Sequence, residues 1–165
     1  MYDYSSYSNY GSTSGLGALF AGMGVLLFVL VAVSVAAYVW TALEYSKVLK
    51  ALGYKNPWMA WIPLANMYAL ADVIRGDDTE TVVWGKSVPA MLFNFWWAIG
   101  MVCCLIPGIG TILYTVLRVV CLGNCFAYIY AAVEGKEVDE VKGIAIASGF
   151  IPIIALIKFT QYKFE

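Results

Sequence analysis

The chain has 165 residues, of which 62% are hydrophobic and 13% are charged, and its mean hydropathy is +0.76. This composition favours one compact helical membrane domain over a soluble protein, and the net charge of −1 argues against a nucleic-acid partner, which would need clustered bases. Histidine is absent, so the commonest general base and transition-metal ligand is missing. We expect no cofactor and no metal site.

The N-terminal third predicts a polar tail followed by a membrane span. Residues Met1–Gly15 are rich in tyrosine and serine, and we expect them to be disordered, or else to order against lipid headgroups or a neighbouring subunit. Leu16–Leu43 contains no charge and is long enough to cross a bilayer with some tilt. The helix is expected to continue to Lys50, with its lysines at the membrane surface.

The next apolar stretch, Pro57–Ala71, is short and contains Pro63. We expect Asn56 to cap a helix that begins at Pro57. The length favours a re-entrant or interfacial segment, although a tilted span stays open. Trp58 and Trp61 are predicted to anchor it at the membrane interface.

Two spans are expected within Ser87–Val133, between two charged loops. The region has no charged residue from Ser87 to Leu117, and Pro107-Gly-Ile-Gly110 divides it into two arms that predict a helical hairpin. The flanking loops are expected at 72–86 and 134–142. The last apolar segment, 143–157, is again short and proline-broken, and it is again expected to be re-entrant or tilted.

The four cysteines fall in this hairpin and are expected to be buried packing residues. Their places in the two arms put the pairs at different depths, which disfavours a disulfide or a zinc site. They are Cys103, Cys104, Cys121 and Cys125.

The dipeptide Ile-Pro occurs at 62–63, 106–107 and 151–152. Spacings of 44 and 45 residues between these prolines could indicate a degenerate internal repeat. The flanking residues barely match, so coincidence is favoured.

The distribution of lysine and arginine sets the expected topology. No base precedes the first span and Lys47 and Lys50 follow it, so the N-terminus is expected outside. Five full spans would divide the bases almost evenly between the two sides. Three full spans plus two re-entrant segments place all of the flanking bases in the cytoplasm, and we prefer this arrangement. The chain then comprises a tail (1–15), one membrane domain (16–160) and a cytoplasmic C-terminal tail (161–165).

Arg118 leads the candidate functional residues because an arginine within a span is costly and rarely faces lipid. It shares a helix face with Thr115. Asn94 and Asn124 are expected level with each other across the hairpin and can hydrogen-bond if their helix faces agree, and Asn66 adds another intramembrane amide.

Two interpretations of these polar residues stay open. They could line a polar cavity beneath the broken segments. Alternatively, they could satisfy one another and lock the helices together, with Arg118 paired to a carboxylate such as Glu44 or Asp72; we favour the second interpretation.

The block Lys55–Tyr68, which reads KNPWMAWIPLANMY, resembles the K-x-G-K-P-G-W-x-x-x-I-P-x-Y-N-x-Y block of a family of small bacterial multi-pass membrane proteins of the DUF5684 type. Asn56 stands between Lys55 and Pro57 here, and Ala65 occupies the usual tyrosine position. The resemblance implies a polytopic protein of a bacterial cytoplasmic membrane, and it implies no activity.

The expected function is therefore non-catalytic: an accessory or scaffold subunit that contacts lipid and packs against itself or another membrane protein. The alternative is a small homo-oligomeric channel or transporter with a polar path near Arg118. An enzyme is disfavoured because the sequence offers no glycine-rich phosphate loop and no convincing nucleophile–base pair.

Overall fold

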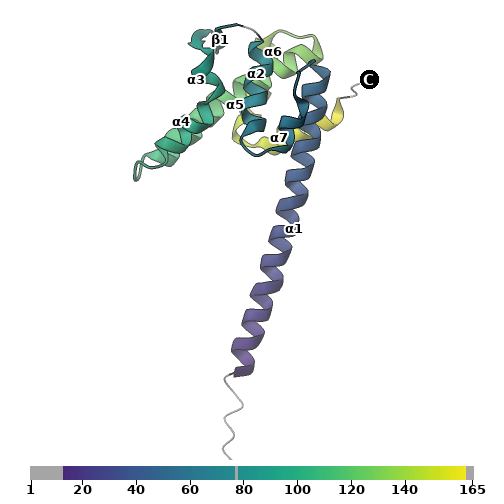
Figure 1. The fold of residues 1–165 in the computed structure, drawn as a ribbon, viewed down its shortest axis with the longest axis vertical. Coiled ribbons are helices and arrows are strands. Elements are labelled where there is room, and N and C mark those ends of the chain that lie inside the picture. Colours follow the sequence, from purple (N-terminus) through teal and green to yellow (C-terminus); the bar gives the residue numbers. More distant parts are fainter. Residues whose placement is uncertain (1–12, 77, 163–165) are drawn as a thin grey trace, which may run out of the picture. The chain divides into compact units, whose positions relative to one another are not determined.

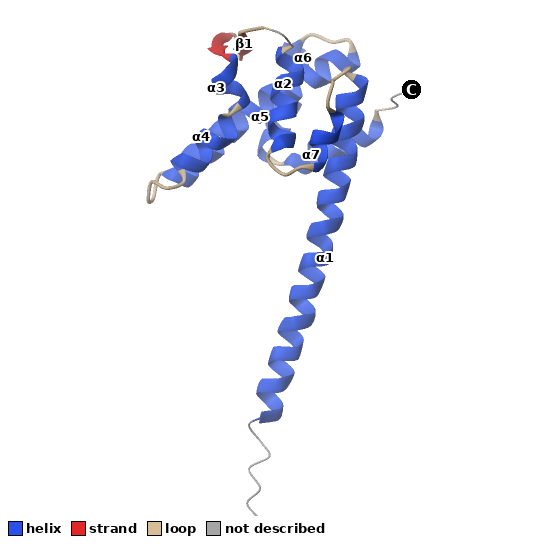
Figure 2. Cartoon of the chain, in the orientation of Figure 1, coloured by secondary structure: helices blue, strands red, loops and turns tan. Residues whose placement is uncertain are grey.

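The computed structural model describes residues 13–76 and 78–162, with side chains described from residue 17 onward. It divides into two compact units, with the boundary between Tyr38 and Val39. The described elements are mostly helical (Figures 1 and 2), as the composition predicts. The expectation for the tyrosine-rich tail falls largely outside the described residues.

The first helix, α1 (Thr13–Ala51), confirms the predicted long helix and its continuation to Lys50. Residues 17–37 expose their side chains on every face. The stretch Gly17–Ala51 is long and apolar enough to span a membrane, and so is Gly110–Glu134 of α5.

Pro57 begins a short 3₁₀ helix, η1 (Pro57–Trp61), as predicted. Asn56 occupies the N-cap position, as predicted, but its side chain makes no capping hydrogen bond. The helix η1 is capped by Ile62. Leu64, which precedes α2 (Ala65–Arg75), has a positive φ of 70°. Pro63 therefore separates two helices because it cannot donate an N–H to a continuous one.

The charged segment predicted as a loop at 72–86 is largely ordered secondary structure. Its first four residues complete α2, and a β-hairpin follows (red in Figure 2), with β1 (Glu80–Val83) antiparallel to β2 (Lys86–Pro89). Val83 pairs with Lys86, so Trp84 and Gly85 form a two-residue turn. Sequence reasoning missed the hairpin because its strands are short and their apolar pattern is weak.

The expected span Ser87–Ile106 is not one helix, which corrects that prediction. Its first residues belong to β2, and α3 (Ala90–Asn94) and α4 (Trp96–Cys103) follow, with a bend at Phe95. The Pro-Gly-Ile-Gly turn is confirmed, because α4 ends at Cys103 and α5 (Gly110–Glu134) begins directly after the turn. Figure 1 shows α4 and α5 side by side above this turn.

The second predicted charged loop is only three residues long. Gly135, in a left-handed conformation, ends α5, and α6 (Val138–Phe150) begins soon afterwards. Pro152 then starts α7 (Pro152–Gln161), so the predicted proline break is confirmed. The break leaves the last carbonyls of α6 without their usual helical donors.

The core of the second unit lies around the C-terminal half of α5, which packs closely on α6. Phe126 and Tyr130 stack on each other, and Phe159 of α7 meets both rings edge-on. Glycines permit close helix contact, since a Cβ on Gly149 would lie 3.0 Å from the Val119 carbonyl oxygen and 3.2 Å from the Gly123 Cα.

The cysteine prediction is only partly right. Cys121 and Cys125 are buried in this core, but Cys103 is half-buried and Cys104 is exposed beside the α4–α5 turn. All four are free thiols. The exposed position of Cys104 follows from the turn, which holds residues away from the core.

Candidate functional site

Arg118 is half-buried on α5, and its guanidinium Nη2 donates a hydrogen bond of 2.7 Å to the Phe150 carbonyl at the end of α6. Ile151 leaves the helix there, with φ −123° and ψ 89°, as expected for a residue that precedes proline. Arg118 thus supplies the donor that the broken helix lacks, and its positive charge complements the negative end of the α6 dipole.

The expected ion pairs of Arg118 are wrong. Glu44 pairs with Lys47 at 2.8 Å, and Asp72 pairs with Arg75 at 2.8 Å. Both pairs join residues three positions apart on one helix, where side chains meet readily. The arginine guanidinium is directed at a backbone carbonyl instead.

Asp72 lies at the centre of a second polar cluster. Its Oδ1 accepts hydrogen bonds from Arg75 Nη2 and from Asn94 Nδ2 (2.9 Å), while Oδ2 accepts one from the Tyr54 hydroxyl (3.0 Å). These donors come from α2, α3 and the loop after α1, so one carboxylate ties three segments together. The cluster borders a pocket of about 260 Å³ that Lys55 also lines.

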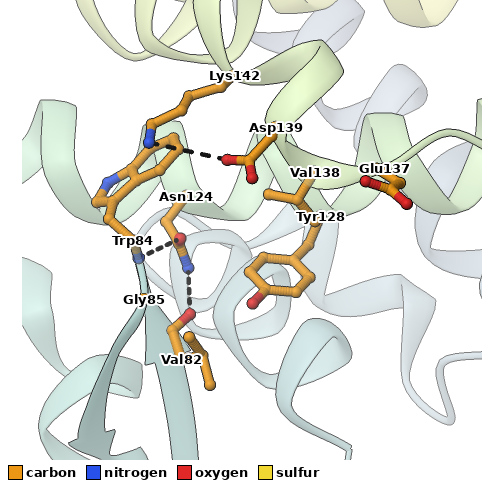
Figure 3. Close-up of a pocket in the computed structure, with 9 residues that line it drawn as sticks. All are labelled: Val82, Trp84, Gly85, Asn124, Tyr128, Glu137, Val138, Asp139 and Lys142. Carbon is orange, nitrogen blue, oxygen red and sulfur yellow. Dashed lines mark hydrogen bonds and ion pairs between the residues drawn. The ribbon is translucent and has the colours of Figure 1, made fainter.

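Asn124 holds the β-hairpin against α5 (Figure 3). Its Oδ1 accepts a hydrogen bond of 3.2 Å from the Trp84 backbone N–H, and its Nδ2 donates one of 3.1 Å to the Val82 carbonyl. The predicted contact between Asn94 and Asn124 is therefore wrong, because the bend at Phe95 and the hairpin give each amide a different partner.

The turn residues Trp84 and Gly85 both have positive φ, 49° and 84°. This conformation suits a two-residue hairpin, yet it is uncommon for a bulky residue such as tryptophan. Two contacts hold the Trp84 side chain in place. Its indole N–H donates a hydrogen bond of 3.0 Å to the Val120 carbonyl, and Lys142 Nζ lies 5.3 Å from the indole centroid. The strain is thus balanced by contacts with α5 and α6.

A pocket of about 300 Å³ lies beside this turn, between the hairpin, α5 and α6. Figure 3 shows Tyr128 and Glu137 on the side opposite Trp84. Lys142 reaches Asp139 at 3.9 Å as well as the indole, and both ends of the Asn124 amide bond the hairpin. The polar groups near the turn therefore serve docking of the hairpin, which is a structural role.

Sequence reasoning missed the cluster around Glu134. Its carboxylate accepts hydrogen bonds from Lys136 (2.8 Å) and Tyr162 (2.5 Å) and pairs with Lys158 (2.6 Å), whose Nζ also lies 4.7 Å from the Tyr130 centroid. These contacts tie the end of α5 to α7. The available signal was the presence of opposite charges at the ends of two apolar segments.

The remaining predicted residues are two tryptophans of η1, Thr115 of α5 and Asn66 of α2. Trp58 and Trp61 are 59% and 43% exposed, and a tryptophan that anchors a segment at the membrane interface needs such an exposed side chain. The Thr115 hydroxyl donates to the Thr111 carbonyl within α5, and Asn66 is buried with its Oδ1 unpartnered. Among the described residues, no hydrogen bond joins two members of the predicted polar cluster, Arg118, Asn66, Asn94, Asn124 and Thr115.

Within residues 13–76 and 78–162, no group of three or more histidine, cysteine, aspartate or glutamate side chains is placed to hold a metal ion. Comparison with known proteins finds no matching family model, no matching curated protein and no matching solved structure.

Proposed function

We propose that this chain is an integral membrane protein with a non-catalytic role, a scaffold or accessory subunit that packs against itself or a larger membrane protein. The observation that carries the proposal is the exposure of residues 17–37 of α1 on every face, without a charge. At 1.5 Å per residue this stretch is about 31 Å long, which matches the hydrocarbon thickness of a bilayer. Apolar surface of this extent needs lipid or another helix around it.

The polar groups of α1 agree with this surrounding. The hydroxyl of Ser34 donates to the Leu30 carbonyl at 2.7 Å, so its hydrogen-bonding need is met inside the helix. The first bases, Lys47 and Lys50, come after the exposed stretch. We therefore propose that the N-terminus lies outside and that these lysines lie in the cytoplasm.

The two proline breaks support the proposed re-entrant segments. Apolar side chains are exposed around both breaks, while the bases that flank the segments lie several residues away. The exposed side chains are Ile62, Leu64, Phe150, Ile151 and Ile153. In this topology the bases stay cytoplasmic and the proline turns enter the membrane. The resemblance of Lys55–Tyr68 is the support for a bacterial cytoplasmic membrane.

A scaffold role follows from how the polar side chains are used. Asp72 joins α2, α3 and the loop after α1, Asn124 holds the β-hairpin, and Arg118 bonds the end of α6. Each group stabilises a junction between elements of the second unit. Such groups define a rigid body for packing against a partner, whereas a conduction path would need polar groups free to bind solute.

Membrane fractionation tests the integral location. The full chain should stay in the membrane pellet after an alkaline carbonate wash and should leave it only with detergent. A variant carrying Leu27→Lys and Leu30→Lys should lose stable insertion, because each lysine near a span centre costs about 3 kcal/mol. The control, Thr79→Lys with Glu137→Lys, adds two lysines outside α1 and should fractionate like the original. Recovery of the unaltered chain in the soluble fraction would overturn the proposal.

Substitution of Arg118 separates a scaffold from a channel. Under the proposal, Arg118→Leu lowers thermal stability or assembly, measured by melting and by mass in detergent, and Arg118→Lys recovers part of the loss by donating to the same carbonyl. A protein that melts and assembles normally after Arg118→Leu but shows altered ion or solute flux in liposomes would favour the channel instead.

A further inference from the structure

The α4–α5 turn carries a cluster of uncovered apolar side chains. On both helices and in the turn, six aliphatic or methionine residues are each more than half exposed: Met101, Val102, Leu105, Ile106, Ile109 and Ile112. The most exposed of them, Leu105, reaches 80%. No charge occurs anywhere between Lys86 and Arg118, so this cluster matches acyl chains in polarity as well as in exposure.

The first arm of this hairpin is too short to cross a bilayer. The helices α3 and α4 contain five and eight residues and are separated by the bend at Phe95, which gives about 20 Å of helix at 1.5 Å per residue. A hydrocarbon core of about 30 Å needs about 20 helical residues. If the β-hairpin stays at the surface, the turn between α4 and α5 ends inside the hydrocarbon.

The backbone of the turn satisfies part of its own hydrogen bonding. Cys104, Leu105, Ile106 and Gly110 donate their N–H groups to carbonyls within the same region, and Pro107 has no N–H to satisfy. Two amide N–H groups of the turn, those of Gly108 and Ile109, have no backbone acceptor. The turn thus pairs four of its six N–H groups with its own carbonyls, which lowers the cost of placing it at membrane depth.

Close packing at the turn depends on Gly110. A Cβ at this position would collide with the Cys103 carbonyl oxygen and would lie 2.9 Å from the Cys104 Cα. Glycine therefore allows α5 to start directly against the end of α4. The result is a compact, uncharged turn without a polar loop that could reach water.

Arg118 follows Gly110 by eight positions, or about 12 Å along α5. Its guanidinium is bound to the Phe150 carbonyl, next to the Ile-Pro dipeptide at 151–152. This charge, the first in the sequence after Lys86, is therefore directed at protein, and it ties the hairpin to the α6–α7 break. This bond lowers the cost of burying the hairpin tip in lipid.

From these observations we infer that the α4–α5 hairpin is itself re-entrant: its turn stays inside the bilayer and is covered by lipid acyl chains. The three Ile-Pro dipeptides then share one role, each marking a turn that enters the membrane from the cytoplasmic side. The inference rests on the proposed membrane location, but it replaces the two hairpin spans of the sequence-based topology.

Cysteine accessibility in membrane vesicles tests this placement. The four native cysteines are first replaced by alanine, and single cysteines are then introduced into this variant. The three positions are Leu105→Cys at the turn, Lys86→Cys at the hairpin base and Ser5→Cys in the N-terminal tail. Right-side-out and inside-out vesicles are treated with a membrane-impermeant maleimide, and then again after detergent is added.

The expected pattern is specific. Lys86→Cys reacts in inside-out vesicles and Ser5→Cys in right-side-out vesicles, while Leu105→Cys reacts at least an order of magnitude more slowly in both and reacts fully in detergent. Rapid labelling of Leu105→Cys from the Ser5 side means that the hairpin spans. Rapid labelling from the Lys86 side means that it stays in water. Either result overturns the inference and leaves the proposed function intact, because Ser5 and Lys86 still report whether α1 crosses.

A second variant avoids the cysteine-free background. Leu105→Lys in the otherwise unaltered chain should reduce the amount of membrane-inserted protein severalfold, because the charge would enter hydrocarbon. The matched control, Thr79→Lys, should insert normally. Equal insertion of the two variants would contradict a turn buried in lipid.

Discussion

Helices α1 and α5 are both long and apolar enough to span a membrane, but their surroundings differ. In the most apolar 18-residue stretch of α1 none of the residues is buried within the protein, whereas 56% of the corresponding stretch of α5 is buried. Seven consecutive residues of α5, Cys121–Ala127, are buried, so this part of the helix is covered on every face. Hydropathy thus indicates that a helix requires an apolar surrounding, but it does not distinguish lipid from protein.

The same contrast occurs within α5. Its first turns carry exposed aliphatic side chains such as Ile112 and Val116, and its second half forms the core of the unit. Arg118 lies where the two halves meet. The polar contact with α6 therefore marks the point at which the helix passes from an uncovered to a protein-covered environment.

The largest expected difference is between two phenylalanines. Phe126→Ala should lower the free energy of unfolding by about 3–5 kcal/mol, because the ring is fully buried against Tyr130 and Phe159. Phe28→Ala, at a position 75% exposed on α1, should change it by less than about 1 kcal/mol. Thermal or denaturant unfolding in matched detergent measures both, and equal losses would mean that α1 is packed against protein.

Glycine substitutions give the next largest contrast. Gly149→Ala places a methyl group 3.0 Å from the Val119 carbonyl oxygen and should destabilise the α5–α6 contact by about 1–3 kcal/mol. Gly22→Ala meets nothing within 4 Å and should be neutral or slightly stabilising, since alanine favours helix. Unchanged melting of Gly149→Ala would show that the two helices are less closely packed than described.

Alanine substitutions of two buried asparagines should differ less in the stability that they cost. Asn124→Ala removes both hydrogen bonds to the β-hairpin and should cost about 1–2 kcal/mol, with faster amide hydrogen exchange at Val82 and Trp84. Asn66→Ala removes an amide whose Oδ1 has no partner and should cost less. If Asn66→Ala destabilises the protein more than Asn124→Ala does, the Asn66 amide stabilises the fold through an interaction other than the hydrogen bonds described above.

The smallest expected effect concerns pH. Burial, followed by the neighbouring Asp72 carboxylate, raises the pKa of Tyr54 above its ordinary value. The neutral phenol is therefore favoured in the folded state, so its contribution to stability is complete below about pH 10 and declines as the pH rises through the folded pKa. Tyr54→Phe should be less stable at neutral pH and should lose less stability than the original chain above pH 10.

Tyr114→Phe is the matched control, because no hydrogen bond is described for that hydroxyl. Its stability should follow that of the original chain from neutral to alkaline pH, as measured by melting at each pH. A Tyr54→Phe variant that follows the same curve would show that the hydrogen bond to Asp72 contributes nothing measurable.

The sequence by itself determined the features that arise from local chemistry. The long uncharged run predicts α1, and the prolines at 57, 63, 107 and 152 mark helix starts or breaks because proline lacks an N–H. The glycines of the hairpin tip predict its turn. These signals depend on a few neighbouring residues, so they do not require knowledge of the rest of the chain.

Only the tertiary structure decided which groups meet. The docking of the β-hairpin by Asn124, the bond from Arg118 to Phe150, the bond from Asn94 to Asp72, and the burial of one half of α5 all join residues far apart in sequence. A polar side chain must find a partner once it is buried, but its type and spacing do not specify which one. That choice follows from the bend at Phe95 and from the close contact of α5 with α6.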